Sequence, residues 1–156
     1  ATKEGLSAVA QDFLDFIVSA DGQKVVQASG YIPLEATRAY SGSKPSGKIV
    51  VAGSSSVTPV MEKLKEAYLA VNTGAQIDIQ QSDSSTGMSS VSEGICDNGM
   101  ASRELKDSET AQGLTATVIA LDGIAVVVNQ KNACTNLTTE QVRSIFTGEV
   151  TTWDAL

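Results

Sequence analysis

The chain has 156 residues, of which 42% are apolar, which is enough for one compact core and too little for two complete lobes with a cleft between them. Its formal net charge of −7 argues against nucleic acid and against anionic membrane surfaces as partners. Because the chain contains no histidine, histidine-dependent catalysis is excluded, and we expect neither a metal ion nor a cofactor.

Residues 1–40 are typical of two helices followed by extended chain. Apolar residues recur at helical spacing over 6–17, which predicts a surface helix packed on a core. A second helix is expected over 22–28, with Asp21 as its cap and Gly30 ending it in a left-handed turn.

Residues 41–47 form the one stretch that resembles a linker, because they offer no apolar residue to bury and have breakers at both ends. They divide the chain into the segments 1–40 and 48–156. We expect both segments to belong to a single α/β lobe that covers 1–156.

A strand, a turn and a helix follow one another twice after the linker. Residues 48–52 predict a buried strand, and a serine-rich turn over 53–56 leads into a helix with one apolar face. Residues 76–80 alternate as a strand, and a second small-residue turn over 82–87 precedes a short helix. Strands that alternate with helices predict an α/β fold with an open, mostly parallel sheet and helices on both faces.

The rest of the chain alternates between β-rich runs and polar helical segments. Strands are expected over 98–102, 115–121 and 124–129. The acidic segment 104–109 is expected to form a solvated helical face. A capping box at 138–141 begins a last helix, whose expected inward-facing residues are Val142, Ile145 and Phe146.

Serine-rich turns follow the first two predicted strands, and the third strand ends in a serine and an arginine. The carboxyl ends of parallel strands meet at one edge of a sheet, where unpaired helix N-terminal amides and serine hydroxyls can donate hydrogen bonds to an oxyanion. The planar guanidinium of the arginine can grip two oxygens together. The predicted anion ligands are Ser54, Ser55, Ser56, Ser84, Ser85, Ser102 and Arg103.

Other uses of these serines stay open at this stage. A single serine before an apolar-periodic run is more often a helix cap, although three such turns on one edge favour the anion site. Neither turn has the spacing of a Walker loop or of a dinucleotide site. A serine nucleophile would need a lysine or a carboxylate as its base, and no spacing in the sequence selects one.

The two cysteines, Cys96 and Cys134, lie far apart in the sequence. They form no CxxC pair, which argues against a metal or dithiol redox site. A structural disulfide and two buried free thiols both fit the sequence.

Several segments together resemble the phosphate-binding proteins of ABC importers. Residues 48–60 resemble the opening strand and turn of that family, 81–87 its second ligand turn and 99–106 its third. Residues 137–148, followed by Trp153, are similar to its helix before the interlobe crossing. The resemblance covers nearly the whole chain and implies one lobe of a two-lobed periplasmic-binding-protein-like fold.

The resemblance also implies how phosphate is held. Some family members place an aspartate in the third turn, where it accepts the proton of phosphate and so rejects sulfate. This chain has serine and arginine there, and Asp83 is the nearest acidic candidate. The residues implied to contact phosphate are Ser55 with the neighbouring amide of Ser56, Ser84, and Ser102 with Arg103.

The order of the segments differs from the common arrangement of the family. Residues 10–34 resemble the segment that usually closes these proteins, yet here they come first. The chain therefore resembles a circularly permuted first lobe, joined through 41–47. The resemblance implies that a second lobe precedes Ala1 in the parent protein or was removed by design.

The predicted function is binding of inorganic phosphate within the extracytoplasmic solute-binding component of an ABC phosphate transporter, without enzyme activity. The implied partners are phosphate, the second lobe and the membrane permease. The implied location is the surface of a Gram-positive-type bacterium, with anchoring through the parent protein, or the periplasm. Three alternatives stay open: a cell-surface interaction lobe without a ligand, a binder of another tetrahedral oxyanion such as sulfate, and, least favoured, a serine-based hydrolase.

Overall fold

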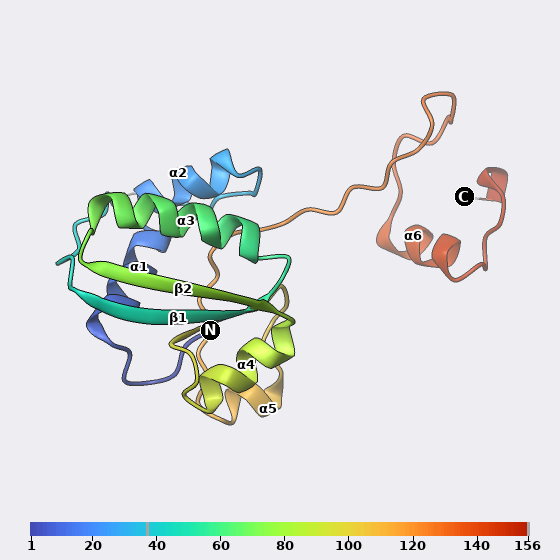
Figure 1. Cartoon of the computed structure of the whole chain (residues 1–156). Helices are drawn as coiled ribbons and strands as arrows, with labels where there is room; N and C mark the ends of the chain where they lie inside the picture. The colour runs from blue at the N-terminus through green and yellow to red at the C-terminus, as the bar shows by residue number, and fades with distance from the viewer. Residues whose placement is uncertain (37, 156) are drawn as a thin grey trace. The chain divides into compact units, whose positions relative to one another are not determined.

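The computed structural model describes residues 1–36 and 38–155, and the chain forms two compact units, Ala1–Gly123 (unit 1) and Ile124–Leu156 (unit 2). Unit 1 contains a three-stranded parallel sheet in the order β2-β1-β3, with helices on both of its faces (Figure 1). The α/β architecture expected from the sequence is thereby confirmed. Within the described residues, every helix is too short or too polar to cross a bilayer.

Two helices open unit 1, α1 (Ala8–Val18) and α2 (Ala20–Ala28). The Ser19 hydroxyl caps α2 by accepting a hydrogen bond from the Gly22 amide at 3.3 Å. The expectation that Asp21 is the cap is therefore wrong, because α2 begins earlier than predicted and Asp21 already lies in its first turn.

The sheet consists of β1 (Gly47–Ser54), β2 (Ala75–Ser82) and β3 (Asn98–Met100). The third strand is shorter than the predicted run over 98–102. Both neighbours of β1 run parallel to it, with Ser54 opposite Ser82 in the register. The carboxyl ends of the three strands consequently lie at one edge of the sheet.

Helices cover both faces of this sheet because the side chains of β1 alternate between two cores. Ile49 and Val51 face the larger core, which includes residues of α1 and α3 (Thr58–Val71). Ala52 faces a smaller core with residues of α4 (Ser84–Ser92). In Figure 1, α3 and α4 accordingly lie on opposite sides of the strands.

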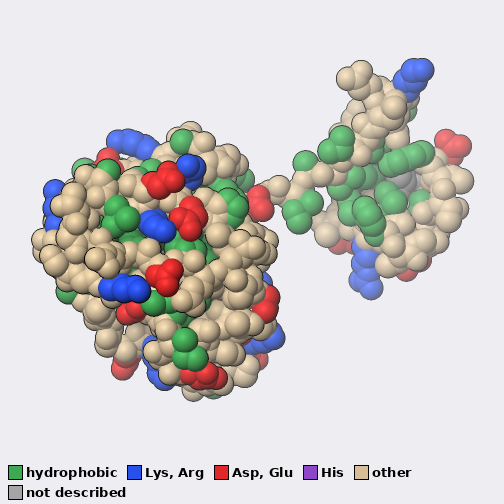
Figure 2. All heavy atoms as spheres, viewed as in Figure 1, with side chains coloured by type: hydrophobic (Ala, Val, Ile, Leu, Met, Phe, Trp, Pro, Cys, Tyr) green, Lys and Arg blue, Asp and Glu red, His purple; other side chains and the backbone are tan. Residues whose placement is uncertain are grey.

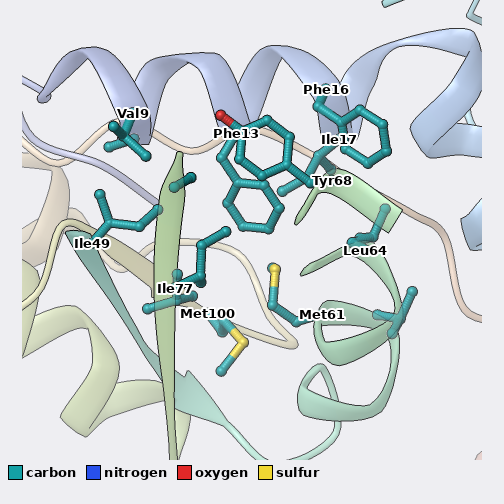
Figure 3. Packing of buried hydrophobic residues seen from close by; sticks show 14 of the residues in the cluster. Val9, Phe13, Phe16, Ile17, Ile49, Met61, Leu64, Tyr68, Ile77 and Met100 are labelled. Atoms are coloured by element: carbon teal, nitrogen blue, oxygen red, sulfur yellow. The ribbon is translucent and has the colours of Figure 1, made fainter. Parts of the chain in front are cut away.

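The larger core joins the segments on either side of the expected linker. Phe13 of α1 packs against Tyr68 of α3 with ring centroids 5.1 Å apart and ring planes tilted by 50° (Figure 3). The buried Asp12 carboxylate accepts hydrogen bonds from the hydroxyls of Tyr68 at 2.7 Å and Tyr40 at 2.5 Å. The segment before 41–47 is thus an integral part of the unit 1 core.

The segment that follows β3 is less regular than the sequence predicts. The helix α5 covers only Asp107–Thr110, and the predicted strand over 115–121 is wrong. Two isolated antiparallel bridges occur there instead, Thr2 with Thr115 and Ile32 with Leu121. A run of β-forming residues makes a strand only where a neighbour offers a continuous ladder of hydrogen bonds, and each of these contacts is a single bridge.

Unit 2 consists of irregular chain, α6 (Thr139–Phe146) and the short 3₁₀ helix η1 (Trp153–Ala155). The predicted capping box of α6 is confirmed. The predicted strand over 124–129 is wrong, because the structure assigns no strand to these residues. The inward orientation expected for Phe146 is wrong, because this side chain is 81% exposed, whereas Val142 and Ile145 are half-buried. None of the residues 124–155 is fully buried.

Candidate anion-binding site

Three loops meet at the carboxyl edge of the sheet, each following one strand. Residues 55–57 form the turn after β1, Asp83 leads from β2 into α4, and residues 101–103 follow β3. The Ser55 amide donates to the Ser82 carbonyl at 2.9 Å, which ties the first turn to the end of β2. The loops that sequence reasoning expected at one edge are therefore neighbours in the structure.

Two glycines allow this close approach. A Cβ on Gly87, in α4, would lie 2.7 Å from the Gly53 Cα and 2.8 Å from the Ala52 carbonyl oxygen. Gly53 itself has a φ of +133°, a conformation that side chains rarely allow, and its missing Cβ would collide with the Met100 carbonyl. Helix α4 and the ends of β1 and β3 can pack backbone against backbone only because both positions are glycine.

Hydrogen bonds connect the start of α4 to the loop after β3. The Ser102 amide donates to the Ser84 hydroxyl oxygen at 3.2 Å, and the two serine hydroxyls lie 3.4 Å apart. The Arg103 Nη2 donates to the Ser85 hydroxyl oxygen at 3.2 Å. Four of the residues predicted as ligands are thus brought together.

The amides at the start of α4 are used differently from the prediction. Asp83 caps the helix: its Oδ1 accepts from the amides of Ser85 at 2.8 Å and Thr86 at 3.0 Å, and its Oδ2 accepts from the Thr86 hydroxyl at 2.6 Å. These bonds, with those from Thr86 the strongest, lower the pKa of Asp83. The expectation of unpaired amides is therefore wrong for Ser85 and Thr86. Both carboxylate oxygens of Asp83, the nearest acidic candidate for a phosphate proton, are bonded to the start of the helix.

The turn after β1 presents its three serines in different ways. Ser54 is buried, and its carbonyl accepts from the Val57 amide at 3.1 Å. Ser55 and Ser56 are exposed, and none of the three caps α3, whose N-cap Val57 makes no side-chain cap bond. In the part of the chain that the structure describes, the amides of Ser56 and Ser84 make no hydrogen bond to the protein. Both amides are available to a ligand.

Tyr31 is a neighbour of this turn that sequence reasoning did not assign to the site. Its hydroxyl donates to the Ser56 carbonyl at 3.1 Å. A groove of about 520 Å³ adjoins the loops, and its lining includes Tyr31, Ser56, Ser102 and Arg103 among mostly apolar residues. A lone aromatic after a helix gives no sequence signal for such a contact.

Arg103 does not hold its guanidinium open as predicted. Nη1 and Nη2 donate to the two carboxylate oxygens of Glu109 at 2.9 and 2.8 Å, and Nη1 also donates to the Glu104 carbonyl at 2.9 Å. The Lys106 amide donates to Glu109 Oε2 at 2.8 Å. The grip on two oxygens expected for an oxyanion is therefore made on Glu109, and the expectation of a solvated acidic face is wrong for this nearly buried residue.

This ion pair shifts the pKa values of both partners. The hydrogen bond with Glu109 raises the pKa of Arg103, and the hydrogen bonds from Arg103 and the Lys106 amide lower the pKa of Glu109 to about 2. One feature of the sequence pointed to a contact of Glu109: it lies three residues after Lys106, the N-cap residue of α5, whose amide it binds. Its spacing from Arg103 in the chain did not indicate the ion pair.

The cysteines are free thiols in this structure. Cys96 is buried in the smaller core of unit 1, and burial raises its pKa. Cys134 is half-buried in unit 2.

The chain matches known proteins over almost all of its length. It is 58% identical over 156 residues to the phosphate-binding protein PstS 2 of Streptococcus agalactiae serotype V, covering 99% of this chain and 53% of that protein. It is 31% identical over 115 residues to the phosphate-binding protein PstS of Bacillus subtilis, covering 72% of this chain and 38% of that protein. The chain thus spans about half the length of the first of these relatives.

Solved structures agree with these sequence matches. A phosphate-binding protein of a phosphate ABC transporter from Streptococcus pneumoniae is 44% identical with a TM-score of 0.88, and the match covers 99% of this chain and 60% of that chain. A putative phosphate ABC transporter substrate-binding protein with bound phosphate, from Clostridium perfringens, is 38% identical with a TM-score of 0.58 over 70% of this chain and 45% of that chain. The model of a PBP superfamily domain matches residues 38–156, and the chain belongs to this superfamily.

Proposed function

We propose that this chain binds inorganic phosphate as one lobe of the extracytoplasmic solute-binding component of an ABC phosphate transporter. The observation that carries the proposal is the meeting of three loops at one sheet edge, where the Ser84 and Ser102 hydroxyls lie 3.4 Å apart and Arg103 donates to the Ser85 hydroxyl. The printed names of the relatives and of the solved structures support phosphate as the anion. The proposed ligands are Ser54, Ser55, Ser56, Ser84, Ser85, Ser102 and Arg103, with Arg103 limited to its Nε–H.

Binding, rather than hydrolysis, fits the contacts of these serines. The hydroxyl oxygens of Ser84 and Ser85 accept from the Ser102 amide and from Arg103, neither of which can remove a proton from serine. Among the described residues, no carboxylate or lysine side chain is hydrogen-bonded to a proposed ligand hydroxyl. The site therefore offers donors for an anion and no base for a nucleophile.

A second lobe is the partner that we propose for the remaining half of the site. The S. agalactiae relative is about twice as long as this chain, which covers 53% of it. Figure 2 shows a cluster of apolar side chains on unit 2. The exposed large apolar side chains of this unit include Ile124 at 97% exposed and Phe146 at 81%. Such side chains are suited to burial against another lobe. The circularly permuted order, the membrane permease as partner and membrane anchoring at the cell surface remain part of this proposal.

Titration of the chain with phosphate, followed by amide chemical shifts in NMR spectra, tests the function at the weak affinity expected for one lobe. We expect saturable shifts at Ser56, Ser84 and Ser102, and a loss of binding of about tenfold in Ser84→Ala, the scale of one hydrogen bond to a charged group. The matched control is Ser89→Ala, on the exposed face of the same helix α4. Sulfate, titrated in parallel, distinguishes phosphate from a general oxyanion site.

Calorimetry on a protein that carries both lobes completes the test. Tight phosphate binding that Ser84→Ala weakens and Ser89→Ala does not would support the proposal. Negligible binding of phosphate by both the lobe and the two-lobed protein would reject it in favour of an interaction lobe without a ligand.

A further inference from the structure

We propose that Glu109 is a positioning residue of the anion site, which holds Arg103 so that the guanidinium supports the Ser85 hydroxyl and adds no net charge to the site. This inference rests on the proposed function and deepens it. It concerns a residue that does not touch the anion.

The contacts of Arg103 leave it little capacity for an anion. Its two terminal nitrogens make four hydrogen bonds, to both oxygens of Glu109, to the Glu104 carbonyl and to the Ser85 hydroxyl. Each terminal nitrogen carries two N–H donors, so only the Nε–H remains. The side chain is therefore fixed in place rather than available to fold around a ligand.

Glu109 is itself held rigidly, which is what a positioning residue requires. Its side chain is 11% exposed, and its Oε2 also accepts from the Lys106 amide at 2.8 Å. This amide belongs to the N-cap of α5, so the helix start sets where the carboxylate lies. A bidentate pair, in which two parallel N–H donors bind one carboxylate, fixes the orientation of both side chains as well as adding energy.

The effect on the serines follows from hydrogen-bond capacity. A hydroxyl that accepts an N–H bond keeps its own proton free to donate. Ser85 accepts from Arg103 and Ser84 accepts from the Ser102 amide, so the loop after β3 supplies an N–H to each serine. The Ser85 proton is thereby left for an anion. The hydroxyls of Ser84 and Ser102 contact each other at 3.4 Å, so one of them donates to the other and the pair keeps one proton for an anion. Arg103 supports the site through Ser85.

The electrostatic consequence is a site with little net charge. The Arg103 and Glu109 charges cancel within one ion pair, and Glu109 stays ionised at neutral pH because its pKa lies at about 2. The other charged side chains that act on this pair are Asp83, near Arg103, and Lys106, near Glu109, and they also carry opposite charges. A neutral site of dipoles distinguishes little between a singly and a doubly charged anion.

Replacing Glu109→Gln tests this through a pH profile. The variant keeps the shape of the side chain, removes one negative charge and leaves Arg103 with an uncompensated positive charge. Phosphate passes from monoanion to dianion as pH rises from 6 to 8. In the variant, we expect the ratio of the phosphate affinity at pH 8 to that at pH 6 to be about threefold higher than in the unaltered chain. This is the scale of one extra charge interaction in water.

Two further variants separate charge from structure. Glu104→Gln removes the same charge from an exposed neighbour and should leave the ratio unchanged. The double variant Arg103→Gln with Glu109→Gln restores a neutral site, and its ratio should return to that of the unaltered chain at a lower affinity. Amide dispersion in the NMR spectra identifies any variant that has lost its fold.

The outcomes separate this inference from the function on which it rests. The positioning role is supported if Glu109→Gln raises the ratio of the phosphate affinity at pH 8 to that at pH 6 and the double variant restores the value of the unaltered chain. This inference alone is overturned if the unaltered chain binds phosphate and the Glu109→Gln variant shows the same ratio of affinities at pH 8 and pH 6. Absence of any phosphate-dependent shift in the unaltered chain and in the two-lobed protein overturns both.

Discussion

The two units of this chain carry secondary-structure signals of similar strength and reach different states. Unit 1 buries an aromatic and aliphatic core on a parallel sheet, with Phe13, Leu64 and Tyr68 completely enclosed. In unit 2, α6 has a good capping box and an amphipathic pattern, yet none of the residues 124–155 is buried. Capping and periodicity therefore start a helix, whereas a second surface is needed to enclose its apolar face.

The largest expected contrast between the units is the cost of removing a phenylalanine. Phe13→Ala should lower the free energy of unfolding of unit 1 by about 3–5 kcal/mol, because the side chain is fully buried. Phe146→Ala should change stability by about 0.5 kcal/mol or less, because the side chain is 81% exposed. All three tyrosines lie in unit 1 and the single tryptophan in unit 2, so urea titration with the two fluorescence signals reports each unit separately.

An equal shift of the tyrosine transition by both substitutions would contradict this contrast. The same two substitutions in a protein that carries the second lobe would test the contrast further. If that lobe covers unit 2, Phe146→Ala should then cost several times more than it does here.

Alkaline pH should act on unit 1 through the phenols of Tyr68, which is buried, and Tyr40, which is half-buried. Burial raises the pKa of Tyr68 to about 12, and it is also the main cause of the raised pKa of Tyr40. Folding favours the protonated phenols, so their contribution to stability is complete below the ordinary tyrosine pKa of about 10 and is lost as pH rises toward 12. Phenolate absorbance should therefore develop together with the loss of near-ultraviolet circular dichroism.

Phenolate formation by all three tyrosines at pH 10.5, with the circular dichroism of the core unchanged, would contradict this expectation. Tyr40→Phe is the informative control, since it removes one of the two phenols that donate to Asp12. Its alkaline transition should involve one phenolate fewer.

Packing at the site should respond to a single methyl group. Gly87→Ala introduces a Cβ against the backbone of Gly53 and Ala52, and overpacking of this kind costs about 1–3 kcal/mol. The strain should move α4 away from the sheet edge and so separate Ser84 from Ser102. We expect a lower urea midpoint and weaker phosphate shifts, with Ser89→Ala on the same helix as the control that changes neither.

The sequence patterns predicted best the elements whose partners lie nearby in the chain. The sequence predicts the strand over 48–52 as a buried strand and the helix after it from helical periodicity, and both pack on the core of unit 1. The strand over 124–129 was predicted wrongly, since the same β-rich pattern has no partner strand among the described residues. Local pattern therefore determines a strand only where the chain supplies its neighbour.

The site was predictable to the level of which loops meet, and not to the level of which groups remain free. Parallel strands bring the serine turns together, as the topology implies. Two carboxylates occupy groups that the sequence had suggested as free donors: Glu109 pairs with Arg103, and Asp83 accepts from the first amides of α4. An acidic run in a polar segment gives no sign that one of its members is nearly buried, because hydropathy alone does not record a paired charge.

The smallest effect that we predict uses the two cysteines as reporters, one in each unit. Cys134, half-buried in unit 2, should react with a thiol reagent within the first minutes, as the unit lacks a core to protect it. Cys96 should react much more slowly, because it is 6% exposed and burial raises its pKa, which lowers the fraction of reactive thiolate. Low concentrations of urea should speed the reaction of Cys96 in parallel with the tyrosine transition and leave that of Cys134 unchanged. Equal rates for the two thiols in native buffer would show that unit 1 opens as readily as unit 2, and the contrast between a unit with a core and a unit without one would then not describe the molecule in solution.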